Sequence, residues 1–181
     1  MKRYTIIAGV NGVGKSSLTG VLKAERNDLG FVIDVDRIAA ESKSGNLEAG
    51  KSAIFLIDRF INEGVSFSQE TTLSGTRTIK NIKIAKKNNY TVRLFYIGLG
   101  RYEESVKRIK NRVEKGGHHV DSIDVIRRYN KRKADLMKIL PLCDEVRFYD
   151  NENGFVEVGE YKNGGIITKG EYKPAWLAEF M

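Results

Sequence analysis

The stretch YTIIAGVNGVGKSS, residues 4–17, decides the fold. Its opening YTIIA, at 4–8, has the β-branched and aromatic composition of a buried strand. A GxxxxGK[ST] pattern follows, and its fixed positions are filled by Gly9, Gly14, Lys15 and Ser16. A helix is expected directly afterwards, over about 15–25. A strand, a glycine-rich turn and a helix in this order predict a loop whose backbone N–H groups converge on phosphate groups at a helix N-terminus.

This loop has the composition of a phosphate cradle for ATP. Glycines let the backbone turn tightly and approach an anion closely. Lys15 would place its ammonium group on the β- and γ-phosphates, and the Ser16 hydroxyl would occupy one coordination position on Mg²⁺. The alternative is a chance glycine-rich turn before a helix, which the agreement of motif, strand and helix disfavours. The expected ATP-binding residues are Gly9, Asn11, Gly12, Val13, Gly14, Lys15, Ser16 and Ser17.

The loop motif alone does not separate a kinase from a GTPase or an ATP-driven motor. GTPases usually carry an NKxD segment for guanine, and no such tetrapeptide occurs here. The chain also lacks anything that resembles the large insertions of transport or helicase ATPases. A small protein of this class with a pair of basic helices after its fourth strand indicates a kinase for nucleotides or other small molecules, in which a lid supplies arginines to the transferred phosphoryl group.

Composition sets the broad class. With 181 residues, 41% hydrophobic and 30% charged, the chain is expected to form a single domain over 1–181. No apolar run is long enough to cross a bilayer, and strand-like residues follow Met1 almost directly, leaving no room for a signal peptide. The expected location is therefore cytoplasmic. Cys143 is the only cysteine, which excludes an internal disulfide and a cysteine-rich zinc site, and we interpret it as a buried apolar residue.

The net charge of +8 is unevenly distributed. Residues 76–147 contain 19 Lys and Arg against 8 Asp and Glu, while the remainder has a small acidic excess. A cationic face of this kind suits polyphosphate ligands, although RNA or an acidic protein would be attracted to it as well. Aromatic residues that would stack on bases are scarce in the two basic helices, where Tyr102 and Tyr129 stand alone. A nucleic-acid partner is therefore disfavoured.

Short apolar runs alternate with amphipathic stretches along the chain, which is typical of βα units and a parallel sheet. We expect a three-layer α/β P-loop NTPase fold with five parallel strands in the order 2-3-1-4-5 and helices on both faces. A helical lid is expected over 101–140 and a small β appendage over 151–181. The predicted strands are 4–8, 31–34, 65–69, 90–98 and 145–150, and the two lid helices are predicted at about 102–115 and 122–140.

Acidic and hydroxyl residues follow the second and third predicted strands. The crevice beyond the carboxyl ends of parallel strands is where α/β proteins bind ligands. Asp36 is the candidate general base for an acceptor hydroxyl, and its alternative role is an N-cap for the helix that follows. Glu70 is expected to hold substrate or a water on Mg²⁺, or to be a solvated strand end. Thr72 is a further candidate for substrate binding, although a threonine in a turn often bonds only to nearby backbone.

Cations recur at helical spacing on the first lid helix. Arg108, Arg112 and Lys115 fall on one face, where like charges repel one another unless an anion such as a γ-phosphate joins them. The alternative is a solvated face, partly offset by Glu104. His118 lies in the glycine turn that separates the lid helices, and with His119 it has no spacing suited to a metal site.

Three segments join the loop motif in a recognisable order: VIDVDRIA at 32–39, ETTLSG at 70–75 and RVEKGGHHV at 112–120. With them the chain resembles the zeta-toxin family of P-loop kinases over residues 4–150. The resemblance implies that ATP and Mg²⁺ are used to phosphorylate a sugar hydroxyl of UDP-N-acetylglucosamine, and that an antitoxin protein is a possible partner. The roles that it implies are a catalytic base at Asp36, substrate contacts at Glu70 and Thr72, and transition-state arginines at Arg112 and Arg128. His118 matches a GGHxV element of the family, and its expected role is either to contact substrate or to fix the turn by hydrogen bonding.

Two departures from the family pattern leave the acceptor open. Asp121 stands where related sequences often have proline, and with Asp124 it has the spacing of a helix-capping pair. Residues 51–54 supply no acid where larger toxins have one. A kinase for another small hydroxylic metabolite and a nucleotide-dependent RNA-binding or regulatory module therefore remain as alternatives.

Overall fold

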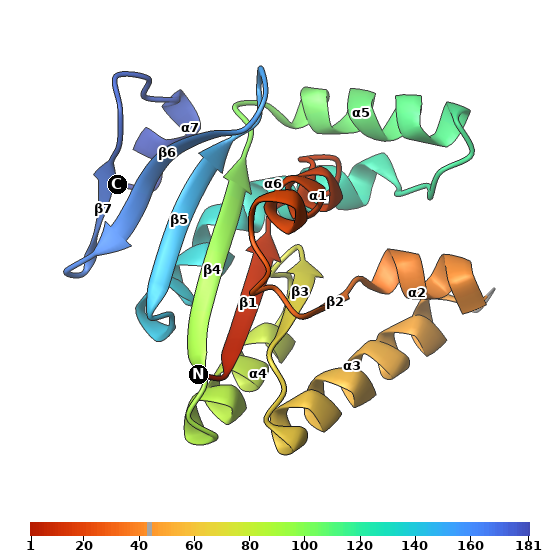
Figure 1. The fold of residues 1–181 in the computed structure, drawn as a ribbon. Coiled ribbons are helices and arrows are strands. Elements are labelled where there is room, and N and C mark those ends of the chain that lie inside the picture. Colours follow the sequence, from red (N-terminus) through yellow and green to blue (C-terminus); the bar gives the residue numbers. More distant parts are fainter. Residues whose placement is uncertain (43–44) are drawn as a thin grey trace.

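The structure is a computed structural model that describes residues 1–42 and 45–181. Within these residues a seven-stranded sheet forms the centre, in the order β2-β3-β1-β4-β5-β6-β7 (Figure 1). Neighbouring strands from β2 to β5 are parallel, whereas β6 and β7 pair antiparallel. The strands are β1 (Arg3–Ala8), β2 (Phe31–Ile33), β3 (Phe67–Thr71), β4 (Thr91–Gly98), β5 (Glu145–Asp150), β6 (Val156–Lys162) and β7 (Gly165–Thr168).

The expectation of a five-stranded sheet with a C-terminal β appendage holds only in part: β2, β3, β1, β4 and β5 lie parallel in the expected order, but β6 and β7 belong to the same sheet. The chain turns back after β5, and β6 pairs with it in the register Arg147↔Glu160, so that the C-terminal strands extend the main sheet. The physical reason is the edge of β5, whose unpaired N–H and C=O groups offer a ready partner to an adjacent extended segment. The α/β class holds, with a mixed sheet in place of a parallel one.

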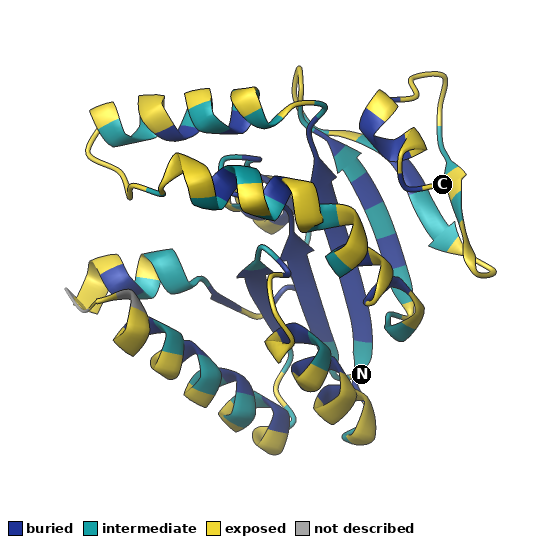
Figure 2. Cartoon of the chain, turned by 180° about the vertical axis from the view of Figure 1, so that it is seen from behind, coloured by how far each residue is buried: buried dark blue, intermediate teal, exposed yellow. Residues whose placement is uncertain are grey.

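Helices cover both faces of the sheet. Alternate residues of β1 point to opposite sides: Ile6 belongs to a core cluster that includes residues of α3, α4 and α7, whereas Ile7 belongs to a second cluster with residues of α1 and Tyr129 of α6. The central strands are buried, and the helices turn their exposed residues outward (Figure 2). The helices are α1 (Lys15–Glu25), α2 (Val35–Ser42), α3 (Asn46–Glu63), α4 (Arg77–Lys87), α5 (Tyr102–Glu114), α6 (Ser122–Met137), the short 3₁₀ helix η1 (Leu140–Leu142) and α7 (Ala175–Ala178).

The predicted lid is a pair of helices, α5 and α6, that pack against each other beyond the carboxyl ends of the strands (Figure 1). Asp121 is the N-cap of α6, and its carboxylate accepts a hydrogen bond from the Ile123 N–H at 2.8 Å. The far end of α6 is anchored in the core through Leu136, which is fully buried. The lid therefore has a fixed base and an exposed turn. In the described part of the chain, no helix has both the length and the apolar character needed to cross a membrane.

Candidate active site

The glycine-rich loop connects the end of β1 to the start of α1. Gly9 has φ 152°, and a Cβ there would lie 2.5 Å from the carbonyl oxygen of Ile97 in β4. Gly14, the residue before α1, has φ 101°, and its Cβ would lie 2.5 Å from the amide nitrogen of Asn151. Both positions thus exclude a side chain, which is why the pattern requires glycine. The N-terminal N–H groups of α1 are left available for an anion.

Lys15 folds back over this loop. Its Nζ donates to the carbonyl oxygens of Gly9 at 3.0 Å and Val10 at 3.1 Å. Burial lowers the pKa of the ammonium group, while the nearby carboxylates of Glu70, Asp36 and Asp34 act in the opposite direction. The cation therefore lies directly over the predicted phosphate site, held by carbonyls that a phosphate can replace.

Glu70 lies beneath the loop, in contact with α1. Its carboxylate accepts hydrogen bonds from Ser16 Oγ at 2.8 Å and Thr19 Oγ1 at 2.7 Å. Burial raises the pKa of Glu70, opposed by its bond from Thr19, and the side chain is nearly inaccessible to solvent. The expectation that Glu70 follows the third strand is wrong, because β3 continues to Thr71. A serine hydroxyl beside a carboxylate is a donor set that suits Mg²⁺.

Two aspartates open α2. Asp34 is the cap: its Oδ1 accepts from the Asp36 N–H at 3.0 Å, and its carbonyl accepts from the Ile38 N–H at 2.9 Å. The alternative role of Asp36 as the N-cap is therefore wrong. Asp36 lies in the first turn with its side chain 47% exposed, and it lines the pocket described below. Its carboxylate is accessible to an acceptor molecule.

The lid reaches over both sides of this site. Arg128 Nη1 donates to Oδ1 of Asn11 in the loop at 2.6 Å, and Arg112 Nη2 donates to the carbonyl of His118 at 2.6 Å. His118 Nε2 in turn lies 3.9 Å from Asp36 Oδ1. The Nε atoms of both arginines are buried and have no hydrogen-bond partner within residues 1–42 and 45–181. The predicted base, the lid turn and the two lid arginines are thus brought together.

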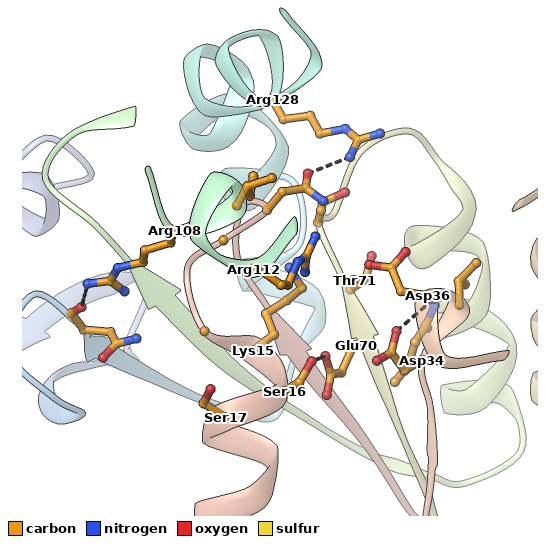
Figure 3. A pocket seen from close by; sticks show the side chains of 18 residues that line it. Lys15, Ser16, Ser17, Asp34, Asp36, Glu70, Thr71, Arg108, Arg112 and Arg128 are labelled. Carbon is orange, nitrogen blue, oxygen red and sulfur yellow. Dashed lines mark hydrogen bonds between the residues drawn. The ribbon is translucent and has the colours of Figure 1, made fainter. Parts of the chain in front are cut away.

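These groups surround a pocket of about 550 Å³. The lid arginines and the acidic residues lie on opposite sides of it (Figure 3). Its lining consists of Asn11, Gly12, Gly14, Lys15, Ser16, Ser17, Asp34, Val35, Asp36, Gln69, Glu70, Thr71, Thr72, Arg108, Ile109, Arg112, Arg128 and Asn151.

Three predicted site residues are absent from the lining. Gly9 contributes a carbonyl to Lys15, Val13 is a fully buried core residue, and His118 reaches the site through Asp36. Thr72 does line the pocket, although its hydroxyl donates to Ser74 Oγ at 3.1 Å within the local turn. The roles assigned to these residues stay predictions.

Asn151 is one of the lining residues that the sequence patterns did not single out. Its Nδ2 donates to the carbonyl of Val13 at 2.8 Å, and its own carbonyl accepts from Arg108 Nη2 at 2.7 Å. It therefore ties the glycine-rich loop to the lid. No motif marks it, but its position directly after β5 puts it at the same carboxyl edge as Asp34 and Glu70, and this position is a usable signal.

A curated protein of Haemophilus influenzae, described only as uncharacterized, is 39% identical to this chain over 126 residues. The match covers 67% of this chain and 88% of the relative. The chain belongs to the family of this Haemophilus protein. No family model matches the chain. Because this relative is described only as uncharacterized, membership of its family does not by itself indicate an activity for the chain.

Solved structures identify the fold. A chain from the PezAT toxin-antitoxin system of Streptococcus pneumoniae has a TM-score of 0.64 at 17% identity, covering 86% of this chain and 71% of that one. The structure of AvrRxo1-ORF1:-ORF2 with ATP has a TM-score of 0.63 at 18% identity, and the match covers 99% of this chain and 63% of the matched chain. A chain of the Pnkp1/Rnl/Hen1 RNA repair complex has a TM-score of 0.62 at 14% identity, and the match covers 76% of this chain and 46% of the matched one. The chain thus shares the fold of these proteins, in line with the fold that the sequence resemblance implies.

Proposed function

We propose that the chain is an ATP- and Mg²⁺-dependent kinase that transfers the γ-phosphoryl group to a hydroxyl of a small molecule. A nucleotide sugar such as UDP-N-acetylglucosamine is the first acceptor to test. One observation carries the proposal: a carboxylate, Asp36, faces a cradle of Lys15 and the lid arginines across a single pocket. Phosphoryl transfer needs these two groups together, because the acceptor must lose a proton while negative charge on the phosphates is stabilised.

The donor side is formed by the loop and the lid. ATP would bind with its phosphates on the loop N–H groups, and Lys15 would exchange its two carbonyl contacts for phosphate oxygens. Arg112 and Arg128 approach from the opposite wall, where their guanidinium groups stabilise charge on the transferred group. Ser16 and Glu70 would hold Mg²⁺, which when bound supplies positive charge to the β- and γ-phosphates.

The acceptor side is formed by α2, the end of β3 and the lid turn. Asp36 would accept the proton of the acceptor hydroxyl as its oxygen forms a bond to the γ-phosphorus. The bond from that phosphorus to the β–γ bridging oxygen breaks, and ADP leaves. His118, 3.9 Å from Asp36, is placed to orient this carboxylate or to contact the acceptor. Thr72 lines the same side.

The fold comparisons support parts of this proposal. One neighbour is a complex with ATP, which supports a nucleotide donor. Another belongs to a toxin-antitoxin system, which supports a possible antitoxin partner. The acceptor rests on the sequence resemblance and on the polar character of the pocket walls.

The test is transfer of radiolabelled γ-phosphate from ATP to UDP-N-acetylglucosamine and to a panel of sugars and alcohols. Asp36→Asn should lower kcat by roughly a hundredfold or more, because the acceptor loses its base. Binding of Mg·ATP should be retained. Glu41→Gln is the matched control, since Glu41 is an exposed acid on the same helix and contacts Arg37 at 3.8 Å. Equal product formation by Asp36→Asn and the native chain would remove Asp36 from the chemistry.

A terminal hydroxyl of an oligonucleotide is the second candidate acceptor. A shallower cavity of about 400 Å³ along α5 is lined by Arg108, Asn111, Arg112, Lys115 and Gly117, and it shares its two arginines with the main pocket. Cations outside the phosphate cradle suit a phosphodiester chain, whose binding weakens steeply with salt. The same transfer assay with a 5′-hydroxyl RNA at low and high salt decides between the two acceptors.

A further inference from the structure

A buried carboxylate closes the end of β5 next to the site. Asp150 is 2% exposed. Its Oδ1 accepts from the indole Nε1–H of Trp176 at 2.7 Å, and its Oδ2 accepts from the Glu152 N–H at 2.9 Å. A buried carboxylate must have its acceptor atoms satisfied, so these two donors fix both the side chain and the backbone that follows it.

The indole of Trp176 is itself held firmly. Trp176 belongs to α7 and is 1% exposed, with ring centroids 6.1 Å from Tyr96 and 5.7 Å from Phe180. The ring lies against Gly98, the last residue of β4, where a Cβ would come within 2.4 Å of it. The C-terminal helix therefore presents one N–H group to Asp150 from a position set by the sheet.

The segment that Asp150 fixes reaches the phosphate site. The next residue, Asn151, donates to the Val13 carbonyl of the glycine-rich loop and accepts from Arg108 of the lid. The side-chain Nδ2 of Asn151 also occupies the space next to Gly14, where a Cβ would lie 2.5 Å from it. Hydrogen bonds thus join α7 to Asp150 and join Asn151 to the loop and the lid, and the peptide bond between Asp150 and Asn151 connects the two sets.

We infer that Trp176 is a positioning residue for the phosphate site, acting through Asp150 and Asn151 on the carbonyl of Val13 and on Arg108. This inference rests on the proposed function, because it assigns the residues after β5 to the nucleotide side of that pocket. Removing the indole N–H takes from Asp150 the donor that holds its Oδ1, although Tyr172 also interacts with this carboxylate, and loosens residues 151–155. The loop then loses the contact that holds its Val13 carbonyl, and ATP binding weakens while contacts to the acceptor are unchanged.

Trp176→Phe tests this inference, since it removes the N–H donor and keeps an aromatic ring. Titration calorimetry should show Mg·ATP binding weakened roughly tenfold. Where transfer is measured, KM for ATP should rise while kcat and KM for the acceptor stay nearly unchanged. Phe180→Leu is the matched control, because it disturbs the packing of the same indole and keeps the N–H that Trp176 donates to Asp150. Phe180→Leu should lower the melting temperature about as much as Trp176→Phe does, but it should leave the affinity for Mg·ATP unchanged. Equal loss of affinity in both variants, or none in Trp176→Phe, would overturn the inference.

A second pair of variants covers the case in which Trp176→Phe fails to fold. Asn151→Ser removes the donor to Val13 on a partly exposed segment, and Asn153→Ser changes an exposed neighbour. The first should reproduce the weakened Mg·ATP binding and the second should not. Equal affinities in this pair contradict the inference.

Hydrogen exchange separates this inference from the proposed function. Exchange of the amides at residues 9–17 should accelerate in Trp176→Phe but not in Phe180→Leu, whether or not a nucleotide binds. A native chain that transfers no phosphate overturns the proposed function alone, whereas unchanged exchange at these amides overturns the positioning role.

Discussion

Ser16 Oγ donates to Glu70 Oε2 at 2.8 Å, which joins the first turn of α1 to a buried position in β3. The other carboxylate oxygen of Glu70 is held by Thr19 one turn further along the same helix. This arrangement places a hydroxyl and a carboxylate side by side at the phosphate loop before any ligand arrives. The two residues proposed to hold Mg²⁺ are therefore oriented by the contact of one helix with one strand.

Glu70→Gln should specifically weaken the dependence of ATP binding on Mg²⁺. The amide keeps the shape and can still accept from Ser16, but it removes the negative charge that attracts the cation. We expect the gain in ATP affinity on adding Mg²⁺ to fall roughly tenfold, measured by calorimetry with and without the metal. Glu63→Gln, at an exposed residue of α3, is the control. An unchanged response to Mg²⁺ would exclude Glu70 from the metal site.

Lys15→Ala should weaken ATP binding by roughly 10- to 100-fold, since a charge-assisted contact to phosphate is lost. Among the residues that the structure describes, the Lys15 ammonium group donates to two backbone carbonyls, so its loss should have a small effect on folding. Calorimetry and a thermal melt measure the two effects. Lys23→Ala, at an exposed position in the last turn of α1, is expected to leave both unchanged. Native-like affinity in Lys15→Ala would refute the phosphate-cradle assignment.

Arg128→Lys should lower kcat by roughly a hundredfold or more with a smaller effect on ATP affinity, because the planar guanidinium is needed where charge develops on the transferred group. Arg127→Lys provides a control from the neighbouring residue, whose guanidinium bonds to Asp124 at 2.7 Å on the exposed side of α6. Steady-state kinetics compare the two variants. Similar kinetics for both would mean that Arg128 only secures Asn11 of the loop.

Asp28→Asn should lower the free energy of unfolding by about 2 kcal/mol at neutral pH. Asp28 bonds to Arg26, Arg3 and Arg93, and the side chain of Arg93 is 2% exposed, so the change leaves a buried cation without its partner. Denaturant unfolding gives the difference. Asp58→Asn, which disrupts the exposed pair with Arg77, should cost at most about 0.5 kcal/mol. An equal cost in both variants would contradict the role of burial.

The same carboxylate makes stability depend on pH. Hydrogen bonds from Arg26 and Arg93 hold the pKa of Asp28 well below its usual range in the folded protein. Such a group contributes stability above its unfolded pKa of about 3.9, and the contribution is lost as the pH falls through the folded value. The difference between the native chain and Asp28→Asn should therefore stay nearly constant from pH 7 to about pH 5 and shrink as the pH falls further. A difference independent of pH would show that this carboxylate does not titrate with folding.

Sequence reasoning succeeded where a local pattern dictates local structure. The glycine-rich loop, the helix after it and the position of Asp36 next to the second strand all follow from short motifs. It failed where partners are distant in the chain. The antiparallel pairing of β6 with β5 has no local signal, and Glu70 was misplaced because β3 extends two residues beyond its apolar run. Asn151 and Trp176 gain their importance from contacts with the loop and with Asp150, which only the tertiary structure reveals.

The central place of β1 has a consequence for how the molecule is assembled. Tyr4 of β1 pairs with Phe67 on one side and with Val92 on the other. The strand that precedes the glycine-rich loop can therefore form its sheet pairs only after residues much later in the chain have been synthesised. Such distant pairings are slow to form and leave an apolar strand unprotected on the ribosome. Asp150 receives its indole donor later still. A nascent chain that stops short of α7 should therefore be a substrate for chaperones rather than an early, partly active enzyme.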